Sequence, residues 1–467
     1  MLTFFLDRSS STSLYEQLYQ NIKKAIELSE LKKNEKLPSK RKLASHLKIS
    51  QTTVETAYMQ LLAEGYIKSV PKVGFFVATK IDLPFKSSDS VESYDQNQES
   101  EDYLIDFRTN QVDSELFPYQ KYAKIAREVI LDKLVKNLNR GDAFGVYDFR
   151  KSIASILFSY RGIVTKPEQI IIGSGSESLL SIIVMLLGRD KVYAVEDPSY
   201  LKNYYLYQAY NVKINTISLD EEGINIQELK KSNTQVVHTT PSHQFPQGIV
   251  TTVNRRLELL KWAHADENRY IIEDDYDSEF RFFGNPIPAM KGLDDSGKVI
   301  YMNSFSKTLA PGLRISFMIL PEKLIKMYRE KLSFYSSSVP TINQLTLEEF
   351  INRGEYEKHL NRMKTNYKAK RDYLLNLLNN CSFKDIIKIK GEESGLHFLM
   401  DIITNKSEEY LLEKAKDKGI RVYGISEYMI RKCSISETKT IVLGYSNLSK
   451  EQLMIGVKLL EEAWKNI

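Results

Sequence analysis

Cysteine is scarce in this 467-residue sequence, and long apolar runs are missing from it. The two cysteines, Cys381 and Cys433, lie too far apart for the paired spacing that zinc sites use. We therefore expect neither a disulfide framework nor a metal site. No apolar run approaches the roughly 20 residues that cross a bilayer, and the N-terminal segment lacks a signal-peptide pattern. These absences lead us to expect a cytoplasmic protein.

Positive charge is concentrated at one end of the chain. The formal net charge is +5. Residues 1–80 carry 13 Lys and Arg against 7 Asp and Glu, whereas the remainder carries 52 against 53. A small basic domain joined to a larger neutral one fits this asymmetry. Such a domain is suited to nucleic acid, because phosphate groups attract Lys and Arg.

Residues 1–80 show the pattern of three short helices and a hairpin. The first helix has apolar residues at helical spacing from Leu14 to Ile26, and Ser13 with Glu16 predicts a capping box at its start. Ser39 begins a second helix, and Ser50 caps a third helix over residues 51–62. Residues 67–77 then read as two strands with a turn at 71–74. Two helices joined by a turn and followed by a wing are typical of DNA-binding domains.

This segment resembles the winged helix-turn-helix of the GntR family of bacterial regulators. The likeness rests on Leu37-Pro38-Ser39, Arg41, Leu43-Ala44, Ser50, Thr53-Val54, Ala57-Tyr58, Leu61, Glu64-Gly65 and the wing residue Gly74. Such domains place the start of the third helix against base edges, while the preceding helix and the wing meet phosphates. The residues expected at DNA are Ser39, Lys40, Arg41, Ser50, Gln51, Thr52, Thr53, Tyr58, Lys72 and Gly74.

Residues 81–104 change in character. Within them, residues 87–102 are polar, acidic and nearly free of aliphatic side chains. Such a segment buries too little apolar surface to offset its chain entropy, so we expect a flexible linker. It would tether a DNA-binding domain over residues 1–80 to a larger domain over residues 105–467.

From residue 105 onward, helical and strand-like stretches alternate. Helical patterns over 116–137 and 149–161 precede short apolar stretches at 169–172, 191–195, 235–239, 269–273 and 298–302. This alternation predicts an α/β fold with a mainly parallel sheet, whose ligands gather at the carboxyl ends of the strands. A second, smaller α/β portion is expected from about residue 320 to 467.

Polar residues follow several of these strands. Gly175 and Ser176 lie in a turn that enters a helix, where backbone amides can hold a phosphate. Tyr200 follows the next strand and could stack on a planar ring, although a buried aromatic is equally compatible. The acidic run at residues 273–277 needs cationic partners; a pyridinium nitrogen and a magnesium ion are both open at this point.

The most informative stretch surrounds Lys307. A lysine just past a strand end can form an imine with a carbonyl cofactor when burial lowers its pKa. Ser304, Ser306 and Arg314 flank it as phosphate partners, with the arginine as a two-pronged clamp.

In this order the motifs resemble fold-type I aminotransferases, and with the N-terminal domain the chain resembles the MocR subfamily of GntR regulators. The sequences of residues 240–246, 273–280 and 443–445 are similar to those of that subfamily. The resemblance implies a multidomain protein, with an α+β winged domain and an α/β domain that binds pyridoxal 5'-phosphate (PLP). It assigns the Schiff base to Lys307, the ring nitrogen to Asp274, O3′ to Tyr276 and a place near the ring to Tyr200. Phosphate contacts fall to Gly175, Ser176, Ser304, Ser306 and Arg314.

Three positions depart from the family pattern. Arg140 stands where a tyrosine is usual, and it could keep a phosphate role. Lys202 replaces an arginine that γ-aminobutyrate-binding members have, and a lysine lacks the carboxylate fork. Either His243 or Gln244 takes the place of the aminotransferase loop asparagine.

The leading interpretation is a transcriptional regulator that senses PLP, an amino compound, or both, through an aldimine at Lys307. A head-to-tail homodimer on an operator with two half-sites is expected from the subfamily. The main alternative is a PLP-dependent aminotransferase with an accessory DNA-binding domain. A DNA-binding regulator whose large domain has lost its cofactor is the third interpretation, and the retained Lys307, Asp274, Tyr276 and Arg314 argue against it.

Overall fold

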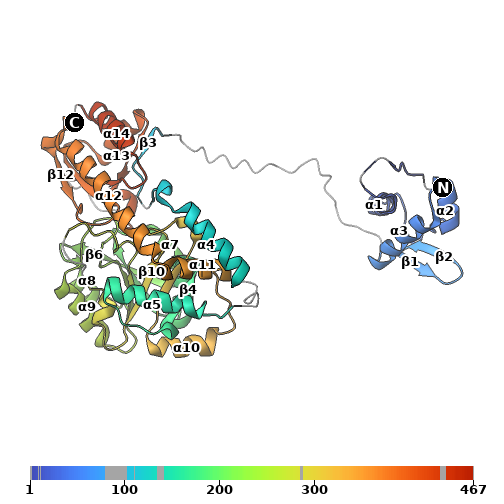
Figure 1. Cartoon of the computed structure of the whole chain (residues 1–467), viewed down its shortest axis with the longest axis horizontal. Helices are drawn as coiled ribbons and strands as arrows, with labels where there is room; N and C mark the ends of the chain where they lie inside the picture. The colour runs from blue at the N-terminus through green and yellow to red at the C-terminus, as the bar shows by residue number, and fades with distance from the viewer. Residues whose placement is uncertain are drawn as a thin grey trace. The chain divides into compact units, whose positions relative to one another are not determined.

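The computed structural model describes residues 3–8, 10, 12–78, 103–109, 111–133, 141–283, 288–431 and 438–465. The chain divides into two compact units, Met1–Ser100 and Glu101–Ile467, which are described separately. Figure 1 labels their helices and strands. Cys433, Arg140 and the expected linker, except for its last two residues, lie outside the described residues.

The N-terminal unit packs three helices against a two-stranded wing. The helices are α1 (Leu14–Glu27), α2 (Lys40–Leu47) and α3 (Gln51–Ala63), and the wing strands are β1 (Ile67–Val70) and β2 (Gly74–Val77). The strands are antiparallel, with Ile67 opposite Val77. A single core cluster joins all five elements and includes Leu18, Leu43, Val54 and Leu61. The expected helix-turn-helix and wing are therefore present.

The helix starts in this unit differ in how they are capped. Ser39 Oγ accepts from Lys42 N at 3.3 Å, and Ser50 Oγ accepts from Thr53 N at 3.0 Å, as expected. Ser13 occupies the N-cap of α1 without a side-chain cap bond, so the expected capping box with Glu16 is wrong. The segment before α1 is held instead by Gln17, whose Nε2 donates to the Asp7 and Thr12 carbonyls.

The large unit is built on a mixed eight-stranded sheet. Its strand order is β4-β11-β10-β9-β8-β5-β6-β7. Strands β10, β9, β8, β5 and β6 run parallel, while β11 is antiparallel to both neighbours and β7 is antiparallel to β6. The bounds are β4 Ile170–Gly173, β5 Val192–Asp197, β6 Lys213–Asp220, β7 Gly223–Ile224, β8 Val236–Thr239, β9 Tyr270–Asp274, β10 Val299–Ser304 and β11 Ser316–Ile319.

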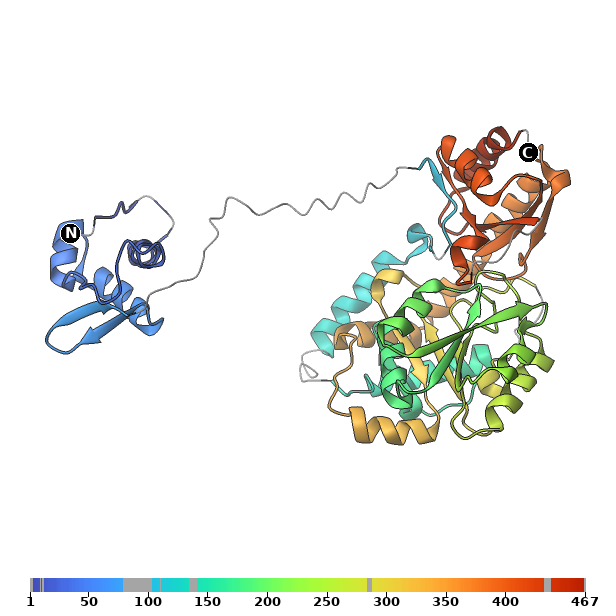
Figure 2. The same ribbon diagram turned by 180° about the vertical axis from the view of Figure 1, so that it is seen from behind.

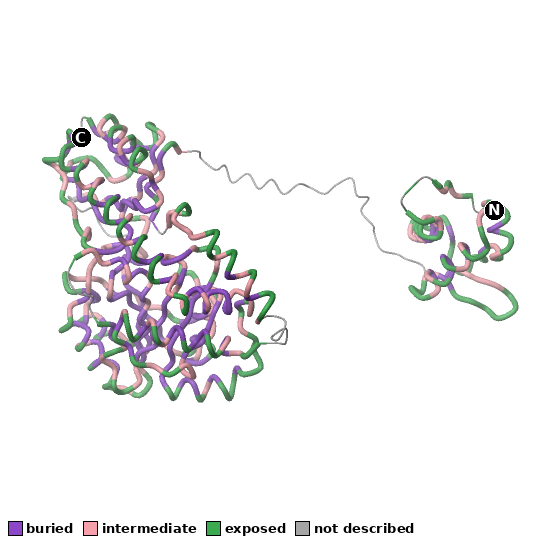
Figure 3. Tube along the Cα trace, viewed as in Figure 1, coloured by how far each residue is buried: buried purple, intermediate pink, exposed green. Residues whose placement is uncertain are grey.

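Helices cover both faces of this sheet, which Figure 2 shows from behind. The helices of the large unit that precede the C-terminal layer are α4 (Tyr119–Asp132), α5 (Tyr147–Arg161), α6 (Ser176–Leu187), α7 (Leu201–Ala209), α8 (Ile226–Lys231), α9 (Val253–His264), α10 (Glu322–Leu332), α11 (Thr341–Asn352) and α12 (Glu355–Asn379). Successive strand residues point to opposite faces. In β10, Tyr301 joins one apolar cluster, while Ile300 and Met302 join another. Strands β4, β5, β8, β9, β10 and β11 are almost wholly buried, in keeping with their apolar runs, whereas β6 is mostly half-buried. Figure 3 shows the buried segments in the interior of the large unit.

The C-terminal part is a smaller layer of different topology. Strands β12 (Ile387–Lys390), β13 (His397–Ile403), β15 (Tyr423–Gly424) and β16 (Thr438–Gly444) form a wholly antiparallel sheet. Helices α13 (Glu408–Asp417) and α14 (Lys450–Ala463) accompany it. The expected second α/β portion is thus an antiparallel α+β layer, because its strands follow one another through turns and helices without parallel crossovers.

The beginning of the large unit belongs to this C-terminal layer. Strand β3 (Ile105–Asp106) pairs in parallel with β14 (Ile420–Arg421). A Cβ added at Gly456 of α14 would lie 2.7 Å from the Phe107 ring, so the helix packs directly on this segment. The expectation that residues from 105 onward open the large subdomain is therefore wrong for residues 105–107.

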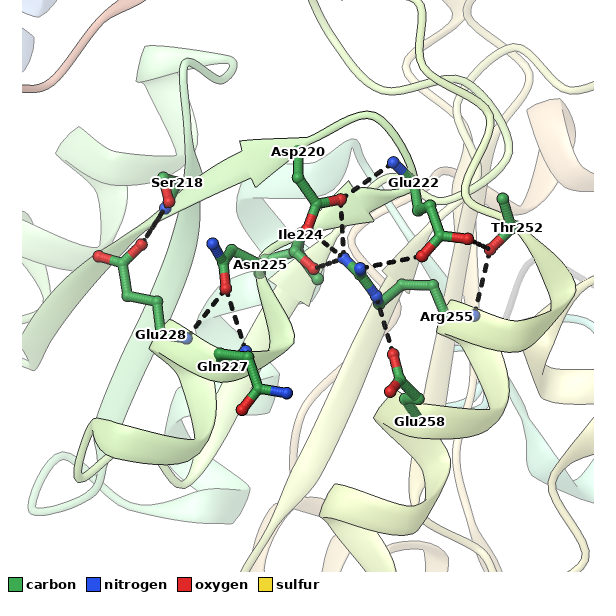
Figure 4. Close-up of polar contacts among 10 residues, drawn as sticks. All are labelled: Ser218, Asp220, Glu222, Ile224, Asn225, Gln227, Glu228, Thr252, Arg255 and Glu258. Carbon is green, nitrogen blue, oxygen red and sulfur yellow. Dashed lines mark hydrogen bonds and ion pairs between the residues drawn. The ribbon is translucent and has the colours of Figure 1, made fainter.

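Arg255 holds the far edge of the large sheet together (Figure 4). Its guanidinium donates to both carboxylate oxygens of Asp220 at 2.9 Å and pairs with Glu222 at 3.2 Å and Glu258 at 3.0 Å. It also donates to the Ile224 carbonyl at 2.5 Å. One buried cation thus fixes the β6–β7 hairpin to the first turns of α9.

No helix among the described residues is long and apolar enough to span a membrane.

Candidate cofactor site and nucleic-acid interface

One cavity of about 210 Å³ lies at the carboxyl ends of the central strands. All nine residues expected at the cofactor line it: Gly175, Ser176, Tyr200, Asp274, Tyr276, Ser304, Ser306, Lys307 and Arg314. They come from the ends of β9 and β10, the loops after β4 and β5, and the turn before β11. The parallel strands bring these separated motifs to the same sheet edge.

Lys307 lies in the turn that follows β10. The turn is anchored by the buried side chains of Phe305 and Leu309. Burial lowers the pKa of Lys307 to about 7, and the nearby carboxylate of Asp277 opposes that shift only in part. A substantial fraction of the amine is therefore neutral near pH 7, which is the form that attacks a carbonyl carbon.

Backbone and hydroxyl donors gather beside Lys307. Gly175 has a φ of +116° and is the N-cap of α6. The first backbone N–H groups of this helix therefore lie at its cavity end. Ser304 Oγ and Ser306 Oγ are 2.7 Å apart, and Ser306 N donates to Ser304 Oγ at 3.1 Å. With the guanidinium of Arg314, these groups form a donor set suited to a phosphate.

Glu177 pairs with two cations of the cavity lining, Arg314 and Lys202. Its Oε2 accepts from Arg314 Nη2 at 2.7 Å, and its Oε1 pairs with Lys202. Burial raises the pKa of the Glu177 carboxyl, but hydrogen bonds from Lys202, from its own backbone N–H and from Arg314 together lower it more, so the net shift is downward. One carboxylate thus pairs with both of these cations, and the three side chains together keep a net positive charge at the cavity.

The acidic run at residues 273–277 separates into different environments. Asp274 Oδ2 lies 3.4 Å from His238 Nε2, and the other ring nitrogen of His238 lies 2.9 Å from the Tyr207 hydroxyl. Glu273 accepts from the backbone of Met290 and Lys291 at 2.7 Å.

Asp275 is buried elsewhere, with Arg161 at 2.8 Å and the Tyr301 hydroxyl at 2.6 Å. Asp274 is thus the carboxylate of these three that lines the cavity. Since the three carboxylates face different partners, their geometry favours a ring nitrogen at Asp274 over a shared magnesium ion.

The Pro-rich loop after β8 contributes other residues than expected. Thr240 and Phe245 line the cavity, whereas neither His243 nor Gln244 does. Gln244 is fully buried, and its amide nitrogen donates to Glu196, to the Pro198 carbonyl and to the Phe245 carbonyl. The expectation that one of these two residues replaces the loop asparagine at the cofactor is therefore wrong for direct contact.

The residues present fit PLP. The cavity offers a low-pKa lysine for the aldehyde, a carboxylate for a ring nitrogen and a donor cluster for the phosphate. Sequence reasoning missed Glu177, Asn203, Thr240 and Phe245 as lining residues. Glu177 directly follows Ser176 and Asn203 directly follows Lys202. Their position next to these candidate residues is the sequence feature that could have indicated them.

Several residues expected at DNA are exposed on the N-terminal unit. Arg41, Gln51, Thr52 and Lys72 are all exposed, at the starts of α2 and α3 and at the wing tip. Lys72 has a φ of 63°, as the tight wing turn requires. Lys40 pairs with Glu55 of α3 at 2.5 Å, which braces the two helices against each other.

Tyr58 is a correction within this set. Its side chain is wholly buried, and its hydroxyl donates to the Pro38 carbonyl at 2.9 Å. It therefore belongs to the core and joins α3 to the start of α2. The expectation of a direct DNA contact from Tyr58 is wrong, because the inward face of the recognition helix carries it.

Comparisons with known proteins agree with both units. Residues 14–77 match the family of bacterial regulatory proteins, gntR family, and residues 103–453 match aminotransferase class I and II. The HTH-type transcriptional regulator YdeL of Bacillus subtilis is 42% identical over 99% of each chain. The probable rhizopine catabolism regulatory protein MocR of Rhizobium meliloti is 28% identical, covering 98% of this chain and 95% of MocR.

A solved structure shows the same fold in the large unit. The kynurenine aminotransferase of Pyrococcus horikoshii superposes with a TM-score of 0.69 at 27% identity, over 78% of this chain and 91% of the enzyme. A winged helix-turn-helix joined to a fold-type I aminotransferase-like domain is thus present in one chain, with full-length relatives that are HTH-type regulators. The chain belongs to the MocR-type subfamily of GntR-family transcriptional regulators.

Proposed function

We propose that this regulator binds PLP in the cavity around Lys307 and changes its action on DNA in response to PLP, to an amino compound that reacts with it, or to both. The observation that carries the proposal is the meeting of Lys307, Asp274 and Arg314 in one cavity. The aminotransferase family is PLP-dependent, and the solved kynurenine aminotransferase is a complex with PMP. When bound, PLP supplies an aldehyde carbon open to amines and an electron-withdrawing ring.

Each residue has a proposed part in holding this group. Lys307 attaches the aldehyde, Asp274 pairs with the ring nitrogen, and Tyr276 donates to the ring oxygen. Tyr200 lies beside the ring. The phosphate is held by Gly175, Ser176, Ser304, Ser306 and Arg314. Burial keeps the Lys307 amine partly neutral and ready for this attachment.

The proposed effector is a small amine without a strong need for a carboxylate clamp. Lys202 is already paired with Glu177, and a lysine lacks the two-pronged geometry of arginine. γ-Aminobutyrate is therefore not the effector we expect. A ligand can shift the regulator only if it binds one arrangement of the chain better than another.

The proposed organisation has three parts. Residues 1–80 bind DNA, residues 81–104 form a flexible linker, and residues 105–467 bind the cofactor, with a small subdomain from about residue 320. We propose a head-to-tail homodimer whose two winged domains contact two half-sites of an operator. Since a regulator of this family acts on DNA, we place it in the cytoplasm.

The test combines absorbance and DNA binding. Purified protein supplied with PLP should gain the visible absorbance of a lysine-bound cofactor, and Lys307→Ala should lack it. Adding PLP or the amine should change occupancy of a promoter fragment in the wild type and not in Lys307→Ala. A wild type that stays colourless with excess PLP would overturn the cofactor proposal.

The second candidate function is transamination. It is favoured by the complete set of Lys307, Asp274 and Tyr276 in one cavity. The protein would then be an aminotransferase with an accessory DNA-binding domain. Several turnovers per subunit with a common amino donor and a keto acid would establish that function, and a single half-turnover would favour the regulator.

A further inference from the structure

The segment before α1 forms an arm that packs on the N-terminal unit. Phe4 and Leu6 contact the apolar core cluster of this unit. Gln17 of α1 clamps the arm from the other side of the chain: its Oε1 accepts from the backbone N–H of Asp7 at 2.8 Å, and its Nε2 donates to the Asp7 carbonyl at 2.9 Å. The arm therefore has a fixed course from Phe4 to Asp7.

Arg8 follows this clamp and lies beside the turn between α2 and α3. Its Nη2 donates to the Lys48 carbonyl at 2.7 Å. Lys48 is the C-cap of α2, with a φ of 52°, and Ser50 is the N-cap of α3. Arg8 and Lys48 are both exposed. A guanidinium is thus held next to the start of the helix that is expected to enter the major groove.

The guanidinium of Arg8 has N–H groups available for a second acceptor. An arginine side chain carries five N–H donors and stays charged in proteins, and the bond to Lys48 uses one of them. Arginine binds phosphate oxygens through parallel N–H groups. Because the bond to Lys48 already holds the side chain in place, a phosphate contact would cost little further ordering of Arg8.

Arg8 and Arg41 mark the two ends of α2. Arg41 lies in the first turn of this helix, and Arg8 is bonded to its C-cap. A helix of eight residues is about 12 Å long, and the major groove of B-DNA is about 12 Å wide. The two guanidinium groups are therefore spaced to meet phosphates on the two sides of one groove.

We propose that the arm before α1 is an additional DNA-contacting element, in which Arg8 binds a backbone phosphate beside the start of α3 and Gln17 is the positioning residue that holds the arm. The inference rests on the DNA-binding role proposed above and extends it beyond α2, α3 and the wing. The ligand is a phosphodiester group of duplex DNA, so the contact adds affinity and fixes orientation without reading a base.

The experiment uses the full chain and a short labelled duplex that the wild type recovers from a randomised pool. Arg8→Gln removes the charge and keeps an N–H for the Lys48 carbonyl, whereas Arg8→Lys keeps the charge. Gln17→Ala releases the arm, and Arg8→Gln/Gln17→Ala completes a cycle. Arg189→Gln, at an exposed arginine of the large unit, changes the net charge equally. Fluorescence anisotropy over a range of salt concentrations gives the affinity and the salt slope.

The expected result is a loss of one phosphate contact. Arg8→Gln should weaken binding by roughly tenfold at low salt and lower the salt slope by about one contact. Arg8→Lys should keep the wild-type slope. Gln17→Ala should lower the slope as Arg8→Gln does, and the double variant should lose no further affinity, because both residues act through one contact. Arg189→Gln should bind as the wild type does.

Contrary results fall into separate classes. A wild-type salt slope in Arg8→Gln would overturn the phosphate contact even if the affinity falls, because a merely structural role leaves the slope unchanged. Equal slope losses in Arg8→Gln and Arg189→Gln would overturn it as well, since they would reflect net charge alone. Additive losses in the double variant would overturn the role of Gln17. A wild type that recovers no duplex from the pool would overturn the DNA-binding role itself, and it is recognised before any variant is compared.

Discussion

Glu177 Oε2 accepts a hydrogen bond from Arg314 Nη2 at 2.7 Å, in the cavity where a phosphate is expected. An anion that enters must compete with this internal carboxylate for the guanidinium. Glu177→Gln should therefore tighten binding of PLP and of inorganic phosphate by roughly threefold to tenfold, the range that a partly exposed ion pair can supply. Titration calorimetry measures the affinity for PLP and the affinity for inorganic phosphate.

Lys202→Ala is the matched comparison for this prediction. It removes a cation that also pairs with Glu177 and leaves the Arg314 contact in place. Anion affinity should stay unchanged or fall in this variant. A Glu177→Gln protein that binds phosphate more weakly than the wild type would show that Glu177 supports the seat instead of competing for it.

The lowered pKa of Lys307, to about 7, predicts a distinctive pH profile. Its ordinary value is 10.5. The rate at which the cofactor-free protein takes up PLP should rise with pH and level off above about 7, because burial leaves the amine neutral from there upward. Stopped-flow absorbance measures this rate.

The same shift has a consequence for folding. Between about 7 and 10.5 the unfolded chain binds a proton at Lys307 that the folded chain does not, so the free energy of unfolding gains a component that rises with pH in that window. Lys307→Met should remove that component.

For the uptake experiment, a PLP uptake rate that keeps rising above pH 9 would contradict a Lys307 pKa of about 7.

Gly175 is a sharp steric test of the phosphate seat. Its φ is +116°, and a Cβ added there would lie 2.4 Å from Arg314 Nη2 and 2.5 Å from Glu177 Oε2. Gly175→Ala should lower PLP affinity by about tenfold or more, because the arginine must leave its position. Gly312→Ala lies in the turn before Arg314, where an added Cβ meets nothing within 4 Å. It should bind PLP as the wild type does; equal losses in both would point to a general effect on the turn.

Asp274 is expected to supply the charge opposite the ring nitrogen. Asp274→Asn keeps the shape and removes the charge, so PLP affinity should fall by roughly tenfold to a hundredfold, as for a lost charge-assisted hydrogen bond. Asp190→Asn, at an exposed acid of the same unit, serves as the control. Unchanged affinity in Asp274→Asn would mean that the ring nitrogen lies elsewhere.

Arg41 and Tyr58 are predicted to affect DNA binding in different ways. Arg41 is exposed on α2, and Arg41→Ala should weaken binding and lower the salt slope by about one phosphate contact. Tyr58→Phe removes a buried bond to Pro38, so it should lower the stability of the N-terminal unit by about 1 kcal/mol and leave the salt slope unchanged. Fluorescence anisotropy over a range of salt concentrations distinguishes them.

Much of the fold could be predicted because local patterns and tertiary contacts agree. Short apolar runs bounded by Gly, Ser and acidic residues became β4, β5, β8, β9 and β10, and their ends converge on one cavity. The serine caps of α2 and α3 were predicted from residue type alone. These features depend on neighbours within a few residues along the chain.

The features that sequence reasoning missed depend on distant partners. Ser13 has the residue type of a cap, but Gln17 holds the entry to α1. The pairing of β3 with β14 joins residues more than 300 positions apart. The partner of Tyr276 is His243, which the sequence offered only as a direct cofactor contact. No local pattern records which side of a loop faces a cavity.

The pairing of β3 with β14 also attaches the beginning of the large unit to the C-terminal layer. The chain that arrives from the N-terminal side is stitched to the C-terminal layer through Ile105 and Asp106, and Ser199, next to the cavity-lining Tyr200, donates its N–H to the Tyr428 carbonyl of that same layer. The loop that carries Tyr200 and the segment that opens the large unit are thus both bonded through their backbones to the C-terminal layer.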